Sequence, residues 1–261
     1  MSSDVSLHVL YKVANAPISL FPYPHVLVRE VFPPDFYQEM RAHLPPREAL
    51  QTIKSLGMVT GTGTFSESRW VLPLVPDKID AIAEPFRSFW NGVASWLIGG
   101  AFGALMLPKF GEFIEQRLGD LRTAQFFDEG YVVQDYTKYS LGPHTDAPKK
   151  VLSLLFYLPA DESQSHLGTS IYVPKDPHFS CAGGPHYPFD LFRRVFTMPY
   201  LPNSLFAFVK TTNSFHGVEP VTDAEARRDL LAYDVKVANR PELSRDIATG
   251  SATGAAPRFA S

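Results

Sequence analysis

Two residues able to bind a metal ion stand two positions apart in the segment YSLGPHTDAPKK, at His144 and Asp146. The run KVLSLLFYLP begins at the end of this segment and has the apolar, β-branched composition that is typical of a buried strand. In an extended segment, residues i and i+2 point to the same side, so this imidazole and this carboxylate could face one metal ion. The pair alone also fits a loop histidine beside an aspartate that caps a turn.

A second histidine and an arginine give this pair a context. His216 follows the apolar run SLFAFVK, and the later segment RRDLLAYDVKV opens a further predicted strand with Arg227 and Arg228. Two histidines and one carboxylate can hold Fe(II) and leave coordination positions open for a cosubstrate and O2. The same ligands could hold zinc in a hydrolytic site. The arginine favours iron, because a dicarboxylate that chelates the metal at one end needs a cation at its other end.

The motifs HTD, FHGVEPV and RRDLL, in this order and with strands around them, resemble the His-x-Asp…His…Arg signature of the 2-oxoglutarate/Fe(II)-dependent oxygenases. The run KVLSLLFYLP resembles the matching strand of the prolyl-hydroxylase-like branch. The resemblance is good over residues 125–237 and loose over the N-terminal helices. It implies a double-stranded β-helix, also called a jelly roll or cupin-like fold, with Fe(II) bound by His144, Asp146 and His216.

The resemblance also implies an arginine that binds the far carboxylate of 2-oxoglutarate, and the alternation along its strand favours Arg228 over Arg227. If Arg228 points inward, alternate residues from Leu231 to Val237 point outward and form an apolar stripe that helices can cover. If Arg227 points inward, Asp229 lies on the same face and repels the cosubstrate carboxylate. We therefore predict Arg228 as the cosubstrate anchor, with Arg227 as the alternative.

Two tyrosines are further candidates for the cosubstrate pocket. In the prolyl-hydroxylase-like branch, a tyrosine just before the leucine that ends the strand helps to hold the far carboxylate, and Tyr157 stands at the matching place. A core tyrosine with a satisfied hydroxyl group is the open alternative for this residue. Tyr136, on the predicted strand before HTD, is a candidate for lining the same pocket, against ordinary packing.

The segment 160–188 is a long connection between the two iron motifs, and the resemblance implies that it shapes the substrate entrance. Polar side chains in or after it that could contact substrate are His186, Tyr187, Arg193 and Arg194. For these, for the other histidines of the segment (His166 and His178) and for Lys149 and Lys150, we favour solvated positions. Cys181 has no visible activating partner, and we assign it no role.

Hydrophobic periodicity predicts the remaining elements. We expect a short apolar segment over residues 1–20, a strand in FPYPHVLVREVF, a helix in PPDFYQEMRAHLP and a loop or bent hairpin over 56–70. Helical spacing continues over 77–120, where Pro85 is expected to kink one helix and Pro108 to start another. The apolar run from Val93 to Pro108 is short for a membrane helix and is broken by glycines, so we expect a buried helix pair.

From about residue 122, short β-rich runs alternate with Gly, Pro, Asn and Asp, a pattern typical of an antiparallel sandwich or barrel. Helices first and strands second predict one α+β oxygenase domain over residues 1–238. Its helical support, about 1–120, would pack on one face of a β-helix core, about 121–238. Residues 239–261 are small and polar, and we expect a loose C-terminal tail.

Composition bounds the partners and the compartment. The 261 residues carry a net charge of −3, which does not indicate a nucleic-acid partner. The single cysteine excludes an intrachain disulfide, and the N-terminus lacks the pattern of a signal peptide. We therefore expect a cytoplasmic protein with no membrane or nucleic-acid partner, with a secreted protein without disulfides as the alternative.

The sequence thus predicts a non-haem Fe(II), 2-oxoglutarate-dependent dioxygenase that uses O2. The predicted reaction hydroxylates an unactivated C–H bond of a small molecule and forms succinate and CO2. A protein side-chain hydroxylase is the main alternative for the substrate. A cupin-type iron oxygenase that does not use 2-oxoglutarate, and a non-catalytic jelly-roll binding module, are the alternatives for the function.

Overall fold

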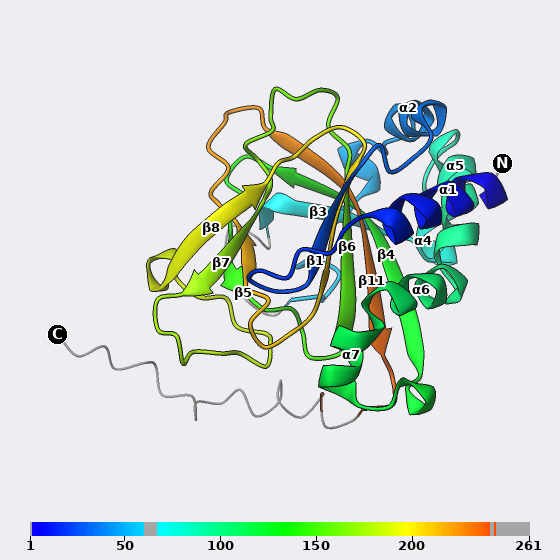
Figure 1. The fold of residues 1–261 in the computed structure, drawn as a ribbon. Helices are drawn as coiled ribbons and strands as arrows, with labels where there is room; N and C mark the ends of the chain where they lie inside the picture. Colours follow the sequence, from blue (N-terminus) through cyan, green and yellow to red (C-terminus); the bar gives the residue numbers. More distant parts are fainter. Residues whose placement is uncertain (1, 60–66, 241–242, 244–261) are drawn as a thin grey trace.

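The computed structural model of the chain describes residues 2–59, 67–240 and 243. Helices gather on one side of these residues, and antiparallel strands form the rest (Figure 1). The larger sheet contains β1 (His25–Arg29), β2 (Gln51–Thr52), β3 (Arg69–Pro73), β4 (Phe126–Tyr136), β6 (Lys150–Tyr157), β9 (Ser204–Val209) and β11 (Arg227–Val237). The smaller sheet contains β5 (Leu141–His144), β7 (Thr169–Pro174), β8 (Phe192–Met198) and β10 (His216–Val218).

The two sheets are antiparallel throughout, with strand orders β1-β9-β6-β11-β4-β3-β2 and β5-β10-β7-β8. Strand β11, which is as long as β4, lies between β4 and β6 at the centre of the larger sheet. One hydrophobic cluster joins residues from both sheets, among them Val133, Phe206, Ile171 and Val218. The sheets therefore pack face to face, and the space between them is the interior of the predicted jelly roll.

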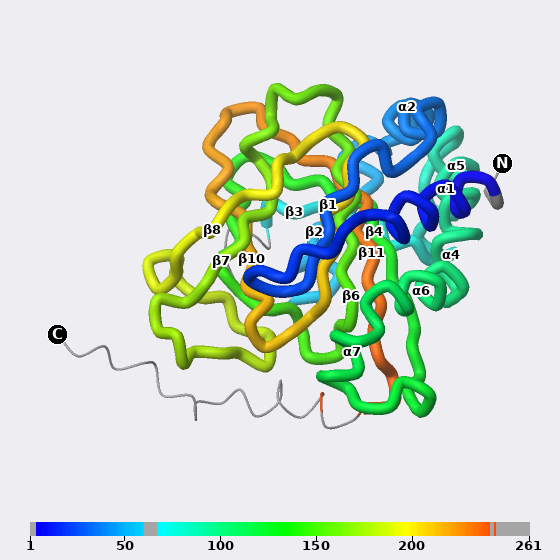
Figure 2. The backbone as a smooth tube through the Cα atoms, viewed as in Figure 1, coloured from blue at the N-terminus to red at the C-terminus, as the bar shows by residue number. Residues whose placement is uncertain are grey.

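The other face of the larger sheet is covered by helices. Alternate residues of β11 from Leu231 to Val237 are buried in a second cluster that includes Trp90 and Phe102. Figure 2 shows the helical layer lying beside β4 and β11. The apolar stripe predicted from strand alternation is therefore the surface on which the helices pack.

The N-terminal segment differs from its prediction. Residues 1–20 were expected to be a short apolar segment, whereas Ser2–Asn15 form helix α1. Val5, Val9 and Val13 recur every four residues and are buried in the helical cluster. Valine has a low helix propensity, so the helix depends on packing that the local sequence does not reveal.

The next two elements follow the sequence closely. Strand β1 carries the predicted apolar positions Val26 and Val28, both buried. Helix α2 (Pro34–Ala42) starts with Pro34 in its first turn and ends before Pro45. The loop or hairpin predicted over 56–70 lies partly outside the described residues, but its flanking strands β2 and β3 pair antiparallel.

The two prolines expected to shape the 77–120 helices act differently from the prediction. The helices here are α4 (Pro76–Ile79), α5 (Phe86–Leu97), α6 (Ala101–Met106) and α7 (Gly111–Leu118). The described residues also form the 3-10 turns η1 (Arg47–Ala49), η2 (Leu107–Phe110), η3 (Leu121–Thr123) and η4 (Phe189–Leu191). Pro85 precedes α5 and separates it from α4, so it kinks no helix. Pro108 lies inside η2, and the helix after it begins at Gly111.

The apolar stretch around α5 and α6 forms the expected helix pair. Trp90, Val93 and Phe102 are buried against the larger sheet. Within the described part of the chain, no single helix has the length and apolar character to cross a membrane. One bent pair, Phe86–Leu97 with Ala101–Leu118, passes that test on length and composition, with an angle of 49° between its halves.

The start of the predicted C-terminal tail is tied to the domain. The side-chain amide of Asn239 donates to the carbonyl of Thr123 at 2.8 Å, and its side-chain oxygen accepts from the backbone N–H of Gln125 at 2.8 Å. Residues 241–242 and 244–261, which make up most of the predicted tail, lie outside the described residues.

Candidate metal centre

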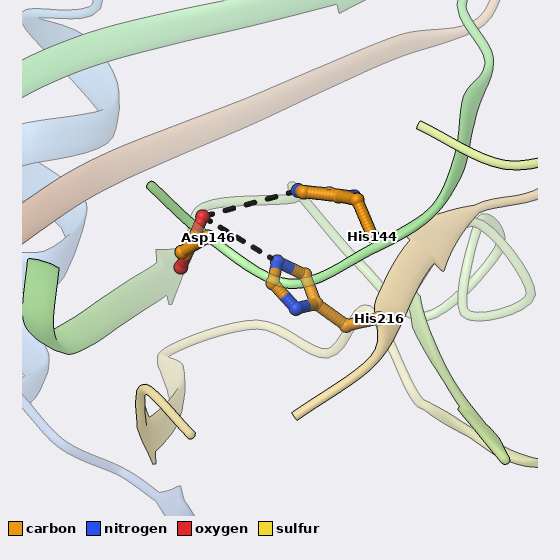
Figure 3. A group of neighbouring side chains, drawn as sticks. All are labelled: His144, Asp146 and His216. Atoms are coloured by element: carbon orange, nitrogen blue, oxygen red, sulfur yellow. Dashed lines mark ion pairs between the residues drawn. The ribbon is translucent and has the colours of Figure 1, made fainter. Parts of the chain in front are cut away.

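Two short strands of the smaller sheet bring the predicted metal ligands together. β5 ends at His144 and β10 begins at His216, and these two residues are paired across the strands. Their ring centroids are 4.3 Å apart. Asp146 follows β5, and its Oδ1 lies 3.8 Å from Nε2 of each histidine (Figure 3). One ligand atom from each of the three residues lies within 4.8 Å of the others.

Hydrogen bonds fix which ring nitrogen of each histidine is free. Nδ1 of His144 lies 3.0 Å from the carbonyl of Gly142, and Nδ1 of His216 lies 3.0 Å from the carbonyl of Ser214. A carbonyl can only accept, so each Nδ1 carries the proton and each Nε2 keeps its lone pair. Both lone pairs belong to the nitrogens nearest Asp146, as metal ligation requires.

The charge states also suit a metal ion. Burial lowers the pKa of His144 well below its usual range, and burial likewise lowers the pKa of His216. Burial alone would raise the pKa of Asp146, but the ammonium group of Lys150 and the hydrogen bond from Ser153 lower it below its usual value. The site therefore offers two neutral imidazoles and one carboxylate, the protonation states that bind metal.

Lys150 and Ser153 hold the carboxylate of Asp146 from the side of β6. The Lys150 ammonium lies 3.2 Å from Oδ1 of Asp146 and 2.9 Å from Oδ2 of Asp234. The Ser153 hydroxyl lies 2.8 Å from Asp146 Oδ2 and 2.9 Å from Asp234 Oδ1, and its single proton serves one carboxylate at a time. This network restricts the orientation in which Asp146 can present an oxygen.

The position of Lys150 corrects the sequence analysis, which favoured a solvated side chain. Regular alternation would put Lys150 and Ser153 on opposite faces of β6. The register with β11 shifts between Val235 and Lys236, so that Val151 is left without a partner. This β-bulge turns Lys150 to the inner face, where its side chain is only 23% exposed.

Arg228 lies in the same pocket as the three metal-ligand candidates and is 1% exposed. Its Nη1 donates to Asp135 Oδ2 at 2.7 Å. Among the described residues, Arg228 Nε and the hydroxyl of Tyr139 are buried without a hydrogen-bond partner. Arg227 is on the opposite face of β11, where its Nε donates to Asp229 Oδ1 at 2.8 Å. The structure thus brings Arg228, and not Arg227, to the metal-ligand candidates.

A second arginine of the pocket escaped the sequence analysis. Arg69 Nε and Nη2 donate to the two oxygens of Asp135 at 2.6 and 2.8 Å. Asp135 lies opposite Arg69 on β3 and opposite Arg228 on β11. From sequence, strand alternation could have placed Asp135 on the same face of β4 as Val133. The contacts between Asp135 and the two arginines depend on the registers of β3, β4 and β11, which the sequence does not reveal.

The two candidate tyrosines have different positions. Tyr157 is fully buried on the inner face of β6, and its hydroxyl accepts from the backbone N–H of Thr169, a residue of the pocket wall, at 3.3 Å. Tyr136 is not brought to the pocket. Its hydroxyl donates to Gln134 at 2.6 Å, and the guanidinium of Arg47 lies 4.7 Å from its ring. Because Asp135 faces inward, its neighbours on β4 face outward.

The pocket between the sheets measures about 90 Å³ and has an apolar middle. The apolar residues of its wall are Val133, Leu141, Leu155, Phe208, Val218, Leu230 and Ala232. A larger hollow of about 290 Å³ lies beside Arg227 and Asp229, away from the metal-ligand candidates. Size alone therefore does not identify the site, whereas the convergence of ligating and charged groups does.

Several other polar residues considered in the sequence analysis have identifiable contacts. His166 pairs with Asp223 at 2.9 Å, and Arg194 lies 3.5 Å from Glu219. The backbone carbonyl of Cys181 accepts from the hydroxyl of Thr145 at 3.0 Å, and Thr145 lies between the ligand candidates His144 and Asp146. His186 is exposed, but its ring centroid lies 4.7 Å from that of His144, so segment 160–188 reaches the edge of the site.

Comparisons with known proteins identify the fold. No protein-family model matches the chain, and no curated protein matches it in sequence. The structure is similar to the "non-heme alpha ketoglutarate dependent carbocyclase SnoK from nogalamycin biosynthesis", with a TM-score of 0.50, 12% identity, and coverage of 94% of this chain and 92% of that one. It is also similar to a prolyl 4-hydroxylase from Phytophthora capsici, with a TM-score of 0.50, 14% identity, and coverage of 91% and 68%.

The predicted fold is confirmed. The core is a jelly roll of two antiparallel sheets, and helices, most of them N-terminal to it, pack on one face. At identities this low, the similarity describes the fold, and the function has to be argued from the site.

Proposed function

We propose that the protein is a 2-oxoglutarate- and Fe(II)-dependent dioxygenase. The observation that carries this proposal is the arrangement of one pocket: His144, Asp146 and His216 converge at one end, and Arg228 is buried in the same pocket. The names of the two similar structures support it, because one is an alpha-ketoglutarate-dependent enzyme and the other a prolyl hydroxylase.

The three ligand residues fit Fe(II). Two neutral imidazole nitrogens and one carboxylate oxygen form the ligand set of non-haem iron oxygenases, which keep open positions for cosubstrate and O2. Within the described residues, the cluster that could hold a metal contains these three residues and no fourth ligand. Zinc could use the same three ligands in a hydrolytic site. The other end of the pocket, where a cosubstrate would bind, therefore has to distinguish an iron oxygenase from a zinc hydrolase.

The far end of the pocket fits the second carboxylate of 2-oxoglutarate. Arg69 and Arg228 share one carboxylate, Asp135, which leaves one positive charge there. At the metal end, Asp146 and Asp234 supply two carboxylates on either side of the Lys150 ammonium. Fe(II) and a dicarboxylate dianion bound together would leave the total charge of the pocket unchanged. Arg228 Nε, a buried donor without a partner, is available to the far carboxylate.

When bound, Fe(II) and 2-oxoglutarate supply oxidising chemistry that uses O2, forms succinate and CO2, and hydroxylates a C–H bond of the substrate. The chain supplies ligation and orientation. His144 and His216 present their Nε2 lone pairs, while Lys150 and Ser153 orient the carboxylate of Asp146. Arg228 orients the far end of the cosubstrate, and the apolar wall excludes water from the reacting groups.

A small molecule is our proposed class of substrate, with a protein side chain as the alternative. The two similar structures include an enzyme named for nogalamycin biosynthesis and a prolyl 4-hydroxylase, so this fold accommodates both classes. Formation of succinate in the presence of small-molecule and peptide collections would separate them. Stimulation by peptides alone would contradict the small-molecule proposal.

The proposed function is tested by substitution of its ligands. We expect His144→Ala and Asp146→Ala to abolish iron-dependent conversion of 2-oxoglutarate to succinate, because each removes one of three metal ligands. Circular dichroism should show a folded protein in both cases. His166→Ala, which changes an exposed histidine outside the pocket, is the matched control and should keep wild-type turnover. Full activity of either ligand variant would show that the metal-ligand assignment is wrong.

A further inference from the structure

Three charged residues line up across neighbouring strands at the far end of the pocket. Arg69 on β3, Asp135 on β4 and Arg228 on β11 are direct neighbours in the sheet registers. The Asp135 side chain is 0% exposed and that of Arg228 is 1% exposed, whereas Arg69 retains 25% exposure. A buried cluster with two cations and one anion is costly unless another anion completes it.

The two arginines bind the shared carboxylate unequally. Arg69 uses Nε and Nη2, one for each oxygen of Asp135, at 2.6 and 2.8 Å. Arg228 makes a single contact, from Nη1 to Oδ2 at 2.7 Å, and its Nε has no partner. Paired, parallel hydrogen bonds are the strongest geometry for a guanidinium and a carboxylate. Asp135 therefore forms its stronger ion pair with Arg69 and its weaker one with Arg228.

We propose that Arg69 is a positioning residue that sets the charge of the cosubstrate site. By occupying both oxygens of Asp135, it prevents that carboxylate from neutralising Arg228 and leaves one positive charge for the far carboxylate of 2-oxoglutarate. This inference rests on the proposed function. Arg69 acts through Asp135 and Arg228, and in its absence Asp135 would form the paired contact with Arg228 instead.

Net charge at the far end then predicts the behaviour of variants. The wild-type cluster carries one positive charge, Arg69→Gln carries none, and Asp135→Asn carries two. The double variant, Arg69→Gln with Asp135→Asn, again carries one. Opposite charges attract strongly in a buried site. The affinity for a dianionic cosubstrate should therefore rise with the positive charge of the cluster, from Arg69→Gln, through wild type and the double variant, to Asp135→Asn. A merely structural role predicts something different, because each further lost contact would then weaken binding.

The experiment is calorimetric titration of 2-oxoglutarate into Fe(II)-loaded protein without oxygen, with Fe(II) affinity and thermal unfolding measured for every variant. We expect Arg69→Gln to weaken 2-oxoglutarate binding at least about tenfold and the double variant to restore it to within about threefold of wild type. Arg47→Gln is the matched control. Arg47 is exposed and stacks on Trp70, outside the pocket, and its substitution should leave binding unchanged.

Unchanged binding by Arg69→Gln, or a double variant as weak as Arg69→Gln, would overturn the inference. Asp135→Asn alone is a second, independent test. If Arg69 sets the charge of the site, Asp135→Asn should bind 2-oxoglutarate at least as tightly as wild type. A loss of affinity as large as that of Arg69→Gln would overturn the inference. Wild-type protein that binds Fe(II) but no 2-oxoglutarate would instead overturn the proposed function, and this inference with it.

Discussion

His144 and His216 owe their tautomers to local backbone geometry. In each case Nδ1 is bonded to the carbonyl two residues earlier in the chain, Gly142 and Ser214 respectively. His25 makes the same bond, to Tyr23 at 2.8 Å, but it is not part of the metal-ligand cluster. This local bond therefore leaves Nε2 of all three histidines free. Only His144 and His216 also lie beside the carboxylate of Asp146, and this proximity distinguishes them from His25.

Arg228 and Arg227 are adjacent in sequence but should differ widely in effect. Arg228→Ala removes the buried cation of the pocket, whereas Arg227→Ala breaks a pair with Asp229 outside it. We expect Arg228→Ala to raise the KM for 2-oxoglutarate at least about thirtyfold, the equivalent of ~2 kcal/mol. Arg227→Ala should change the KM by less than about threefold. Steady-state kinetics checks both values.

The reverse ranking of these two variants would move the anchor by one residue. Metal-dependent turnover that persists unchanged in Arg228→Ala would favour a cupin-type iron oxygenase without 2-oxoglutarate. The sequence could predict which arginine points inward because alternation along one strand suffices for that decision. It could not predict Arg69, because the contact between Arg69 and Asp135 depends on the register between two strands far apart in the chain.

Lys210 should make stability depend on pH. Its side chain is buried, donates to Thr145 at 3.1 Å and to the carbonyl of Thr211 at 2.7 Å, and burial lowers its pKa to about 8. The unfolded chain keeps this proton up to a pKa of 10.5. Between these values the unfolded state binds more protons, so the contribution of Lys210 to stability rises with pH there.

We predict the size of this effect from a comparison with Lys210→Met in metal-free protein. From pH 8 to pH 10.5, the free energy of unfolding of wild type should increase relative to the variant by about 3 kcal/mol. Chemical denaturation at several pH values measures it. A difference between the two proteins that stays constant over this range would show that the Lys210 ammonium is not destabilised by burial.

At the scale of elements, the candidate metal site depends on two strands that local sequence does not indicate. β5 and β10 contain four and three residues, and each includes a glycine. Short glycine-containing segments carry little strand propensity, so these strands exist because β5 pairs with β10 and β10 pairs with β7. The sequence therefore indicated three candidate ligands but not the strand pairing that brings them together.

The close approach of these strands leads to a prediction about Gly217. A Cβ atom at Gly217 would come within 2.5 Å of the carbonyl oxygen of Leu141, so Gly217→Ala must push β5 and β10 apart. We expect at least about tenfold weaker Fe(II) binding and a loss of about 1–3 kcal/mol in stability. Gly92→Ala, on helix α5 with open space around it, is the control and should be neutral or slightly stabilising.

Fe(II) titration and chemical denaturation of the two glycine variants check this prediction. Wild-type metal affinity in Gly217→Ala would mean that the spacing of β5 and β10 does not position the histidines. The β-bulge that turns Lys150 inward and the packing of helix α1 share one property with the pairing of β5 and β10. All three arise from contacts between distant segments, which periodicity in one segment cannot reveal.

At the scale of the whole molecule, the larger sheet separates two environments. Its outer face is covered by helices, and its inner face forms one wall of the pocket. The helical layer also reaches the metal end, because Arg117 on α7 donates to the carbonyls of Pro148, Lys150 and Lys210. Alternation along β11 was sufficient to predict that helices cover one face of this sheet. The expected boundary near residue 120 between helices and strands stays a prediction, and β1, β2 and β3 from the first half of the chain also join the larger sheet.

The central claim is that one pocket holds Fe(II) and 2-oxoglutarate together. Its most direct test is an anaerobic absorption titration of metal-free protein with Fe(II) and then with 2-oxoglutarate. We predict a weak visible charge-transfer band that appears only when both are present and that is lost in Asp146→Ala. Absence of the band in protein shown to bind Fe(II), or absence of Fe(II) binding itself, would contradict the account.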